Sequence, residues 1–196
     1  MEKAYFLCAV FILCCLACDS QDEILTPEAE LLFKNASSTL TNSEKNEIFT
    51  LTQFQVAKNG KQFQFKDGTA SGFPFDVVVY PVDLNRDGKE EIALQFGNSF
   101  TSGADGVSYH LFIKDTSKRY TSSFGFPGVL LLATTKNMNY PDILVGGAGF
   151  SPYPVWRWNG SAYEYFDTVE RSVVESMPPV FITDASKAYV AALEDQ

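Results

Sequence analysis

The stretch Asp83-Leu84-Asn85-Arg86-Asp87-Gly88-Lys89-Glu90-Glu91 decides how the middle of the chain folds. Side-chain oxygens stand at its first, third, fifth and ninth positions, and a glycine stands sixth. A loop of this kind wraps around a hard cation, because alternate side chains turn inward, the seventh backbone carbonyl adds an oxygen, and glycine permits the sharp turn. We therefore predict one calcium site, with the ligands Asp83, Asn85, Asp87, the Lys89 carbonyl and Glu91. The alternative is an ordinary acidic turn, since Asn, Asp and Gly favour turns without a metal.

The residues on either side of this loop indicate strands, not the two helices of an EF-hand. An EF-hand carries a bidentate glutamate at position 12, where this chain has Leu94 inside the apolar run Ile92–Phe96. The run Val77–Tyr80 leads into the loop and is typical of a buried strand. We expect the loop to join these two strands.

Further patterns predict a mainly β (α+β) fold. Aromatic residues alternate in Trp156-Arg157-Trp158 and again in Tyr163-Glu164-Tyr165, and Asn159-Gly160 between them is a turn signal, so a hairpin is expected. The remaining strands are expected at Phe63–Phe65, Tyr109–Ile113, Val129–Ala133 and Ile143–Val145.

Short helices are expected before and after the β-rich part. Thr26-Pro27-Glu28 offers an N-cap, a proline at the first helical position and an acid in the first turn, so a helix to about Asn35 is predicted. Thr41 and Glu44 form a capping-box pattern, which predicts a helix over 42–52. A last helix is expected from Asp184 to Glu194.

The segment Asn137-Met138-Asn139-Tyr140-Pro141-Asp142 echoes the calcium loop in a weaker form. Glu91 aligns with Asp142, and an apolar run follows each of them. With this echo, the chain resembles the FG-GAP/VCBS repeats of β-propellers, in which a loop D-x-N/D-x-D-G-x-x-D/E feeds a strand. The resemblance covers roughly residues 76–166 and implies calcium at the five ligands named above. The echo has lost the central Asp-Gly, so we expect no metal there.

Two such units are too few to close a propeller ring, which needs about four or more blades. We therefore expect a single domain over residues 41–196. Its expected architecture is blade-like antiparallel sheets that form an incomplete, propeller-like body, with short helices at the N-terminal side.

The amino-terminal segment has the pattern of an export signal. Lys3 precedes the apolar stretch Tyr5–Ala17, which is too short for a comfortable membrane span and has the length of a signal-peptide core. The stretch Cys15-Leu16-Ala17-Cys18 resembles the lipobox of bacterial lipoproteins, although leucine is usual where Cys15 stands. The resemblance implies a signal peptide over residues 1–17, lipid on Cys18, and a tether and linker over 18–40. The alternative is an ordinary secretory signal cut near Ala17.

The acidic run Asp19–Glu23 loosely resembles the export signals of surface lipoproteins in Bacteroidetes-type bacteria. We therefore expect a lipid-anchored protein of the cell envelope, in the outer membrane or at the cell surface. In enteric bacteria, Asp19 directly after the cysteine would instead indicate retention in the inner membrane. All four cysteines lie at or before Cys18, so the rest of the chain has no disulfide and no thiolate metal site.

Residues suited to catalysis are few, and no catalytic residue is assigned. His110 is the only histidine, which excludes a histidine-rich zinc site. A hydrolase built on His110 and Ser108 would need a triad that the spacing does not indicate. Aromatic residues that are candidates for a sugar or peptide platform are Phe150, Tyr153, Trp156, Trp158, Tyr163 and Tyr165. Alternation along the strands assigns about half of them to the core.

These patterns predict an envelope-anchored lipoprotein whose calcium-stabilised β-rich domain binds a partner or acts as a scaffold. The expected partners are the membrane, through the lipid, and a protein or glycan ligand. Nucleic acid is not expected, because the formal net charge is −9 and no basic patch is visible. The alternative is a secreted or surface hydrolase that acts on envelope polymers. A position of His110 beside a carboxylate in an open cleft would favour the hydrolase.

Overall fold

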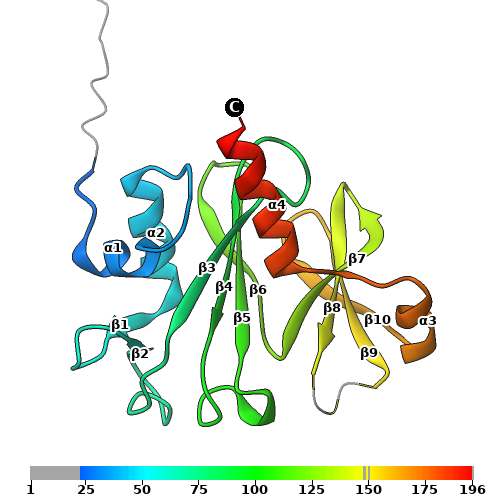
Figure 1. Cartoon of the computed structure of the whole chain (residues 1–196), viewed down its shortest axis with the longest axis horizontal. Helices are drawn as coiled ribbons and strands as arrows, with labels where there is room; N and C mark the ends of the chain where they lie inside the picture. The colour runs from blue at the N-terminus through cyan, green and yellow to red at the C-terminus, as the bar shows by residue number, and fades with distance from the viewer. Residues whose placement is uncertain (1–22, 148, 150, 196) are drawn as a thin grey trace, which may run out of the picture.

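Two antiparallel sheets follow one another along the chain, each with its main strands in sequence order (Figure 1). The first sheet contains β3 (Val77–Val82), β4 (Glu91–Phe96), β5 (Ser108–Lys114) and β6 (Tyr120–Pro127). The second contains β7 (Val129–Asn137), β8 (Tyr140–Gly146), β9 (Tyr153–Trp158) and β10 (Tyr163–Val169), and the short β11 (Val180–Phe181) pairs with β7. The structure, a computed structural model, describes residues 23–147, 149 and 151–195.

The smaller elements surround these sheets. A two-stranded sheet joins β1 (Phe54–Val56) to β2 (Phe63–Phe65). The helices are α1 (Pro27–Phe33), α2 (Asn42–Thr52), the 3-10 turn η1 (Gly103–Asp105), α3 (Arg171–Ser176) and α4 (Ile182–Glu194). The expectation of a mainly β fold with several antiparallel sheets and a few helices is confirmed. Among the described residues, no sheet closes on itself and no propeller ring is present.

Local capping explains the N-terminal helices. The Thr26 hydroxyl accepts the Ala29 N–H, and Pro27 follows it at the first helical position, as predicted. Thr41 and Glu44 form the predicted capping box at the start of α2. Both helices were predicted, and α1 ends at Phe33, just short of the expected end near Asn35.

The predicted strands are present, but β1, β11 and the longest of the unpredicted strands, β6, were missed. The pairing of β6 with β5 shifts between Leu111 and Phe112, where Phe124 and Ser122 are the successive partners. Ser123 is therefore an extra residue in a bulge, and it interrupts the alternation that would have marked the strand. Thr121 and Ser122 add polar character, as is usual for a strand at a sheet edge.

Two apolar clusters hold the layers together. The inter-sheet core lies between the two large sheets, with Leu111 and Phe124 from the first and Ile143 and Trp158 from the second. The N-terminal core packs the other face of the first sheet against the helices and the β1–β2 pair; its members include Leu32, Phe33, Leu40, Ile48, Phe54, Ile92 and Leu94. The first sheet thus lies between the N-terminal helices and the second sheet (Figure 1).

The aromatic hairpin was predicted correctly, and its four aromatic side chains share one face of the sheet. Trp158 pairs with Tyr163 and Trp156 with Tyr165, so all four side chains lie on one face of β9 and β10. That face is the inner one, because Trp158 and Tyr163 belong to the inter-sheet core and only Tyr165 is exposed. Trp158 and Tyr163 are buried, Trp156 is half-buried and Tyr165 is exposed, so the expectation that about half of these aromatic residues lie in the core is confirmed for these four. Phe150 lies outside the described residues.

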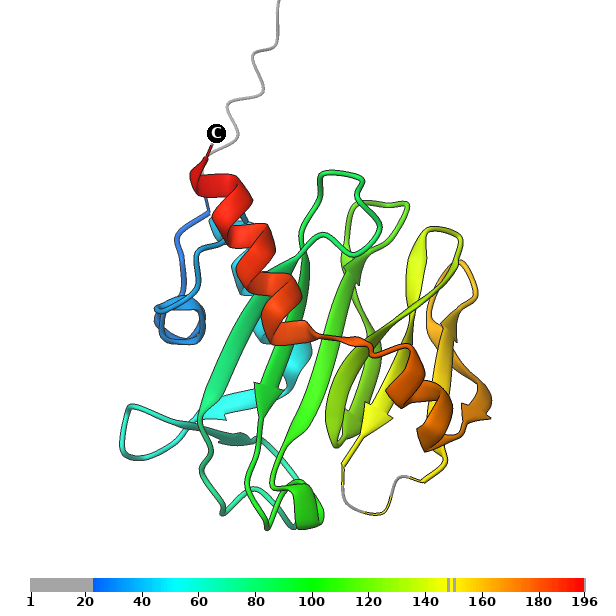
Figure 2. The same cartoon turned by 45° about the vertical axis from the view of Figure 1, so that its right-hand side comes forward.

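The C-terminal helix α4 crosses the first strand of each sheet. It packs against β3 and also contacts β7, and Figure 2 shows it lying across β3. The helix begins at Ile182, two residues before the expected Asp184. The Ile182 side chain is buried in the inter-sheet core. No helix in the part of the chain that the structure describes is long and apolar enough to span a bilayer.

Candidate functional site

The predicted calcium loop connects β3 to β4 and is wound around one carboxylate. Asp83 accepts the Asp87 N–H at 3.1 Å and the Gly88 N–H at 3.0 Å, using both of its oxygens. The Asn85 side-chain oxygen also accepts the Asp87 N–H, at 3.0 Å. Gly88 has φ +79°, a conformation that glycine adopts without strain. The backbone amides of the loop therefore converge on its first and third side chains.

Glu91 lies beneath this loop, at the first position of β4, and its side chain is buried. Its Oε2 accepts the Leu84 N–H at 2.6 Å, and its Oε1 accepts the hydroxyl hydrogen of Tyr140 at 3.1 Å. Burial raises the pKa of Glu91 to about 8, and the negative charges of Asp83 and Asp87 push it in the same direction. The charges of Asp83 and Asp87 thus disfavour a charge on Glu91, and no cationic side chain among the described residues forms an ion pair with it.

Asp87 has a cation beside it. The Lys89 ammonium lies 3.0 Å from Asp87 Oδ2, and the Lys89 N–H donates to Oδ1 at 2.9 Å. Burial opposes ionisation of Asp87, but the hydrogen bonds from Lys89 outweigh it, and the pKa of this carboxyl is lowered. Binding of a metal at Asp87 requires the Lys89 ammonium to move away, which its exposed position on the loop permits.

The predicted ligands lie in one loop without forming a ready-made cage. No group of three or more His, Cys, Asp or Glu residues within the described ranges is arranged to hold a metal. The donor set nevertheless fits a hard cation, because Asp83, Asn85, Asp87, the Lys89 carbonyl and Glu91 offer only oxygen. Both oxygens of Asp83 and both oxygens of Glu91 accept hydrogen bonds within the protein, so these carboxylates would have to exchange partners to coordinate an ion.

The loop also connects three parts of the fold through residues that sequence reasoning missed. Glu90 is buried and accepts the Ser38 hydroxyl at 2.6 Å and the Thr39 N–H at 2.8 Å, so it binds the segment between α1 and α2. On α4, burial and the Glu90 carboxylate raise the pKa of Tyr189 to about 12. Tyr140, from the second sheet, bonds both Glu91 and the Asn85 side chain.

No local sequence signal marks Glu90 as different from its neighbour Glu91. Its role depends on residues far away in the chain. Tyr140 had a partial signal, because it lies inside the segment that echoes the loop.

The echo segment has a different structure from the loop it resembles. Met138 and Asn139, with φ +50° and +70°, form the two-residue turn between β7 and β8. Asp142, which aligns with Glu91, is buried and receives two hydrogen bonds from Arg157, at 2.9 and 2.7 Å, and one from Thr135 at 2.7 Å. Burial opposes ionisation, but these bonds lower the pKa of Asp142. A guanidinium thus neutralises the carboxylate at this position.

His110 lies in the middle of β5 and packs among aromatic rings. The ring of Phe96 is 4.7 Å away, and the rings of Phe112 and Phe54 are 6.1 and 6.3 Å away. Burial lowers the pKa of His110 to about 4, and its Nδ1 has no hydrogen-bond partner among the described residues. The Ser108 hydroxyl donates to Ser102 at 2.8 Å. Ser108 and His110 therefore do not form a nucleophile–base pair in this arrangement.

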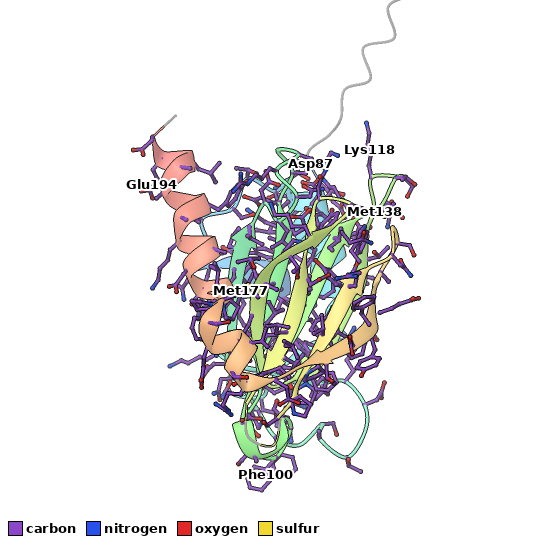
Figure 3. The ribbon with its side chains drawn as sticks, turned by 90° about the vertical axis from the view of Figure 1, so that its right-hand side faces the viewer. Asp87, Phe100, Lys118, Met138, Met177 and Glu194 are labelled. Carbon is purple, nitrogen blue, oxygen red and sulfur yellow. The ribbon has the colours of Figure 1, made fainter. Side chains whose placement is uncertain are left out.

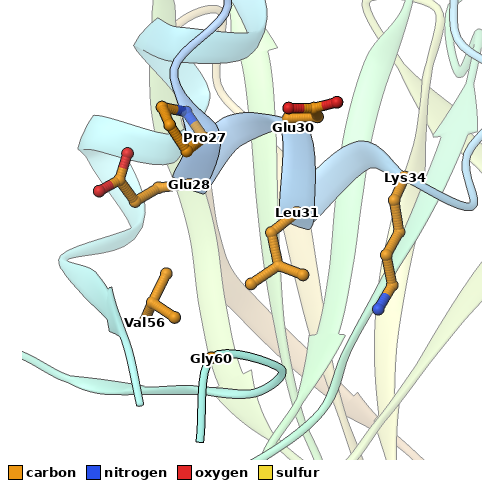
Figure 4. Close-up of a pocket in the computed structure, with 7 residues that line it drawn as sticks. All are labelled: Pro27, Glu28, Glu30, Leu31, Lys34, Val56 and Gly60. Atoms are coloured by element: carbon orange, nitrogen blue, oxygen red, sulfur yellow. The ribbon is translucent and has the colours of Figure 1, made fainter. Parts of the chain in front are cut away.

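Several hollows mark the surface. One of about 490 Å³ lies between α1 and the turn after β1; Figure 4 shows its lining residues, Pro27, Glu28, Glu30, Leu31, Lys34, Val56 and Gly60. A groove of about 510 Å³ lies beside the predicted calcium loop, and its lining includes Asp87, Lys89, Tyr140 and Trp158. Figure 3 shows Asp87 and Met138 at one end of the molecule and Phe100 at the other.

The remaining predicted site residue, Cys18, and the whole expected signal peptide lie outside the described residues. Comparison of the chain with models of known protein families, with curated proteins and with solved structures found no match. What the protein does is therefore inferred from its own residues.

Proposed function

We propose that this chain is a lipid-anchored protein of the bacterial envelope whose β-rich domain is stabilised by one calcium ion and serves as a binding or scaffold module. The observation that supports it best is the loop over residues 83–91. Burial raises the pKa of Glu91 there to about 8, and the nearby carboxylates of Asp83 and Asp87 act in the same direction. A divalent cation at the loop oxygens would relieve this repulsion.

The finer reading of the fold belongs to the same proposal. Each large sheet contains a four-stranded antiparallel meander, to which β11 adds a fifth strand in the second sheet. The first hairpin of each meander carries one copy of the loop or its echo. This order supports a relation to the blades of FG-GAP/VCBS proteins. The two blades would form an open pair. The strands that would line the centre of a ring are β3 and β7; α4 packs against β3, and β11 pairs with β7.

Calcium would act structurally. The ligands would be the side chains of Asp83, Asn85, Asp87 and Glu91 and the carbonyl of Lys89. Because Glu90, next to Glu91, holds the segment before α2, and Tyr140 holds the second sheet, an ordered loop would fix the relative positions of three parts of the domain. Ion binding to the native state alone stabilises it, by about 2.7 kcal/mol at 100 times the dissociation constant.

A thermal melt in millimolar calcium and in chelator tests the metal. We expect a higher melting temperature in calcium, and we expect Asp87→Asn to remove that difference. The matched control is Asp184→Asn, at an exposed position on α4, which should keep it. Magnesium should replace calcium poorly, because it needs a tight octahedron and retains its waters. Identical melts of the wild-type protein in both buffers would leave the loop as an ordinary acidic turn.

Fractionation of expressing cells tests the anchor. We expect the wild-type chain in the outer-membrane fraction, labelled by fatty acid, and the Cys18→Ser variant in the soluble fraction, since stable anchoring requires more than one acyl chain. Digestion by protease added to intact cells would place the domain on the surface. A wild-type chain that takes up no fatty acid would contradict the anchor and favour an ordinary signal cut near Ala17.

A further inference from the structure

A cavity lies on the outward face of the second sheet, beneath α3. Its volume is about 250 Å³, and β7, β8, β9 and β10 all contribute to its floor. The outward face of the first sheet is different, because the N-terminal helices and the β1–β2 pair cover it and form a large core with it. The second sheet has only the six-residue helix α3 above it, so the space between helix and sheet remains incompletely filled.

Most of the cavity wall is apolar. Leu144 and Val155 form part of a small cluster on this face, separate from the inter-sheet core, and Val174 of α3 packs against the same cluster. Val173 and Met177 stand at the rim and are 40% and 55% exposed. Apolar walls with a rim of exposed apolar side chains are typical of small-ligand sites.

Among the charged residues that line this cavity, Arg157 is held in a fixed orientation. The Arg157 guanidinium bonds both oxygens of Asp142, and the Phe166 ring lies 3.6 Å from its central carbon. Asp142 is itself 1% exposed, whereas the Arg157 side chain is 31% exposed. A guanidinium has five N–H donors, and Asp142 takes two of them. No other described residue accepts a hydrogen bond from Arg157, which is one of the residues that line the cavity, so three of its donors have no partner among the described residues.

The charges around the cavity select the kind of ligand. Asp142 already neutralises Arg157, and Asp167 also lines the cavity. The local charge is therefore negative, which disfavours an anion, while the free N–H groups call for an acceptor oxygen. We propose that this cavity binds a small uncharged molecule with a branched apolar body and a carbonyl or amide oxygen, with the oxygen at Arg157 and the body against Leu144, Val155 and Val174.

Two probes that differ only in charge test this proposal on the full chain. N-acetylleucinamide is neutral, and N-acetylleucine carries a carboxylate at pH 7. In a methyl NMR titration, we expect the neutral probe to shift the Val155 and Val174 methyl signals in a saturable way. We expect the anionic probe to bind at least tenfold more weakly. Equal binding of both probes, or shifts spread over exposed apolar residues elsewhere, would overturn the proposal.

Variants locate the binding. Ala133→Leu adds bulk to the cavity wall without changing any charge, so it should abolish the saturable shifts. Val78→Leu, at an exposed position on the first sheet, is the matched control and should leave them unchanged. The paired change Asp142→Leu with Arg157→Leu removes the donors together with their counter-ion, and it should remove the preference for the amide over an alkane of similar size. Unaltered binding in Ala133→Leu would show that the probe lies elsewhere.

Discussion

At the scale of single residues, the pKa values of two ionisable groups, the buried Glu91 and the half-buried His110, are shifted in opposite directions. Glu91 is a carboxyl whose pKa is raised to about 8, and His110 is an imidazole whose pKa is lowered to about 4. In both cases burial favours the neutral form. Glu91 stands among polar groups that a metal could join, whereas His110 stands among aromatic rings. The same physical effect therefore marks a candidate site in one place and a packed core in the other.

His110 makes the stability of the domain depend on pH. Its pKa in the native state, about 4, is below the ordinary 6.5, so the native state binds fewer protons than the unfolded one. The contribution is complete above pH 6.5 and is lost as the pH falls towards 4. We expect the wild-type free energy of unfolding to drop by about 3 kcal/mol more than that of His110→Leu between pH 7 and pH 4.

Urea denaturation of both proteins at several pH values, in chelator, checks this prediction. Comparison with His110→Leu cancels the titration of the carboxylates that the two proteins share. Parallel curves for the two proteins would mean that His110 is protonated in the native state and has a partner or a route to water.

At the scale of elements, local signals predicted most of the secondary structure because they depend on neighbours in the chain. The capping box of Thr41 and Glu44 is one such signal, and the Asn159-Gly160 hairpin is another. The missed β6 depends on the bulge at Ser123, and a bulge is specified by the partner strand. The candidate loop could be predicted for the same reason, because its residues are consecutive in the sequence. Its hydrogen bonds with Ser38 and Tyr140 could not be predicted, because they arise only from the tertiary fold.

In the echo hairpin of the second sheet, the buried carboxylate of Asp142 is stabilised by Arg157 and not by a metal. Breaking the Asp142–Arg157 pair from one side leaves a buried charge without a partner, which typically costs 3–5 kcal/mol. Solvent reaches part of Arg157, so we expect Arg157→Leu to lower the free energy of unfolding by about 3 kcal/mol, at the lower end of that range. The double variant Asp142→Leu/Arg157→Leu should be close to wild type, because it leaves no buried charge without a partner and Leu144 and Val155 line the same cavity.

Chemical denaturation of the two single variants and the double variant forms a double-mutant cycle that measures this coupling. Additive losses would mean that the two side chains act independently. In that case Thr135, which also bonds Asp142, would be the main partner of the carboxylate.

At the scale of the whole molecule, the end that carries the loop joins the two sheets by hydrogen bonds as well as by apolar contact. Tyr140 comes from the second sheet, and Asn85 and Glu91 belong to the first hairpin of the other sheet. The Glu90 side chain binds the segment before α2 on the other side. Three layers of the fold therefore meet at a loop of nine residues. A substitution in that loop should change the stability of the whole domain.

The Tyr140 hydroxyl tests how calcium and the contact between sheets depend on each other. Without calcium, Tyr140→Phe leaves Glu91 Oε1 without its donor, so we expect a loss of about 1–2 kcal/mol in the free energy of unfolding. With calcium, the Glu91 oxygens would have the ion as partner, and the loss should be smaller. The stabilisation by calcium should therefore be larger in Tyr140→Phe than in wild type. Tyr163→Phe is the matched control, because its hydroxyl bonds the Pro141 carbonyl within the second sheet and does not touch the loop. Melts of the three proteins with and without calcium measure how much calcium stabilises each of them. Equal stabilisation of all three would mean that the loop binds its ion independently of the second sheet.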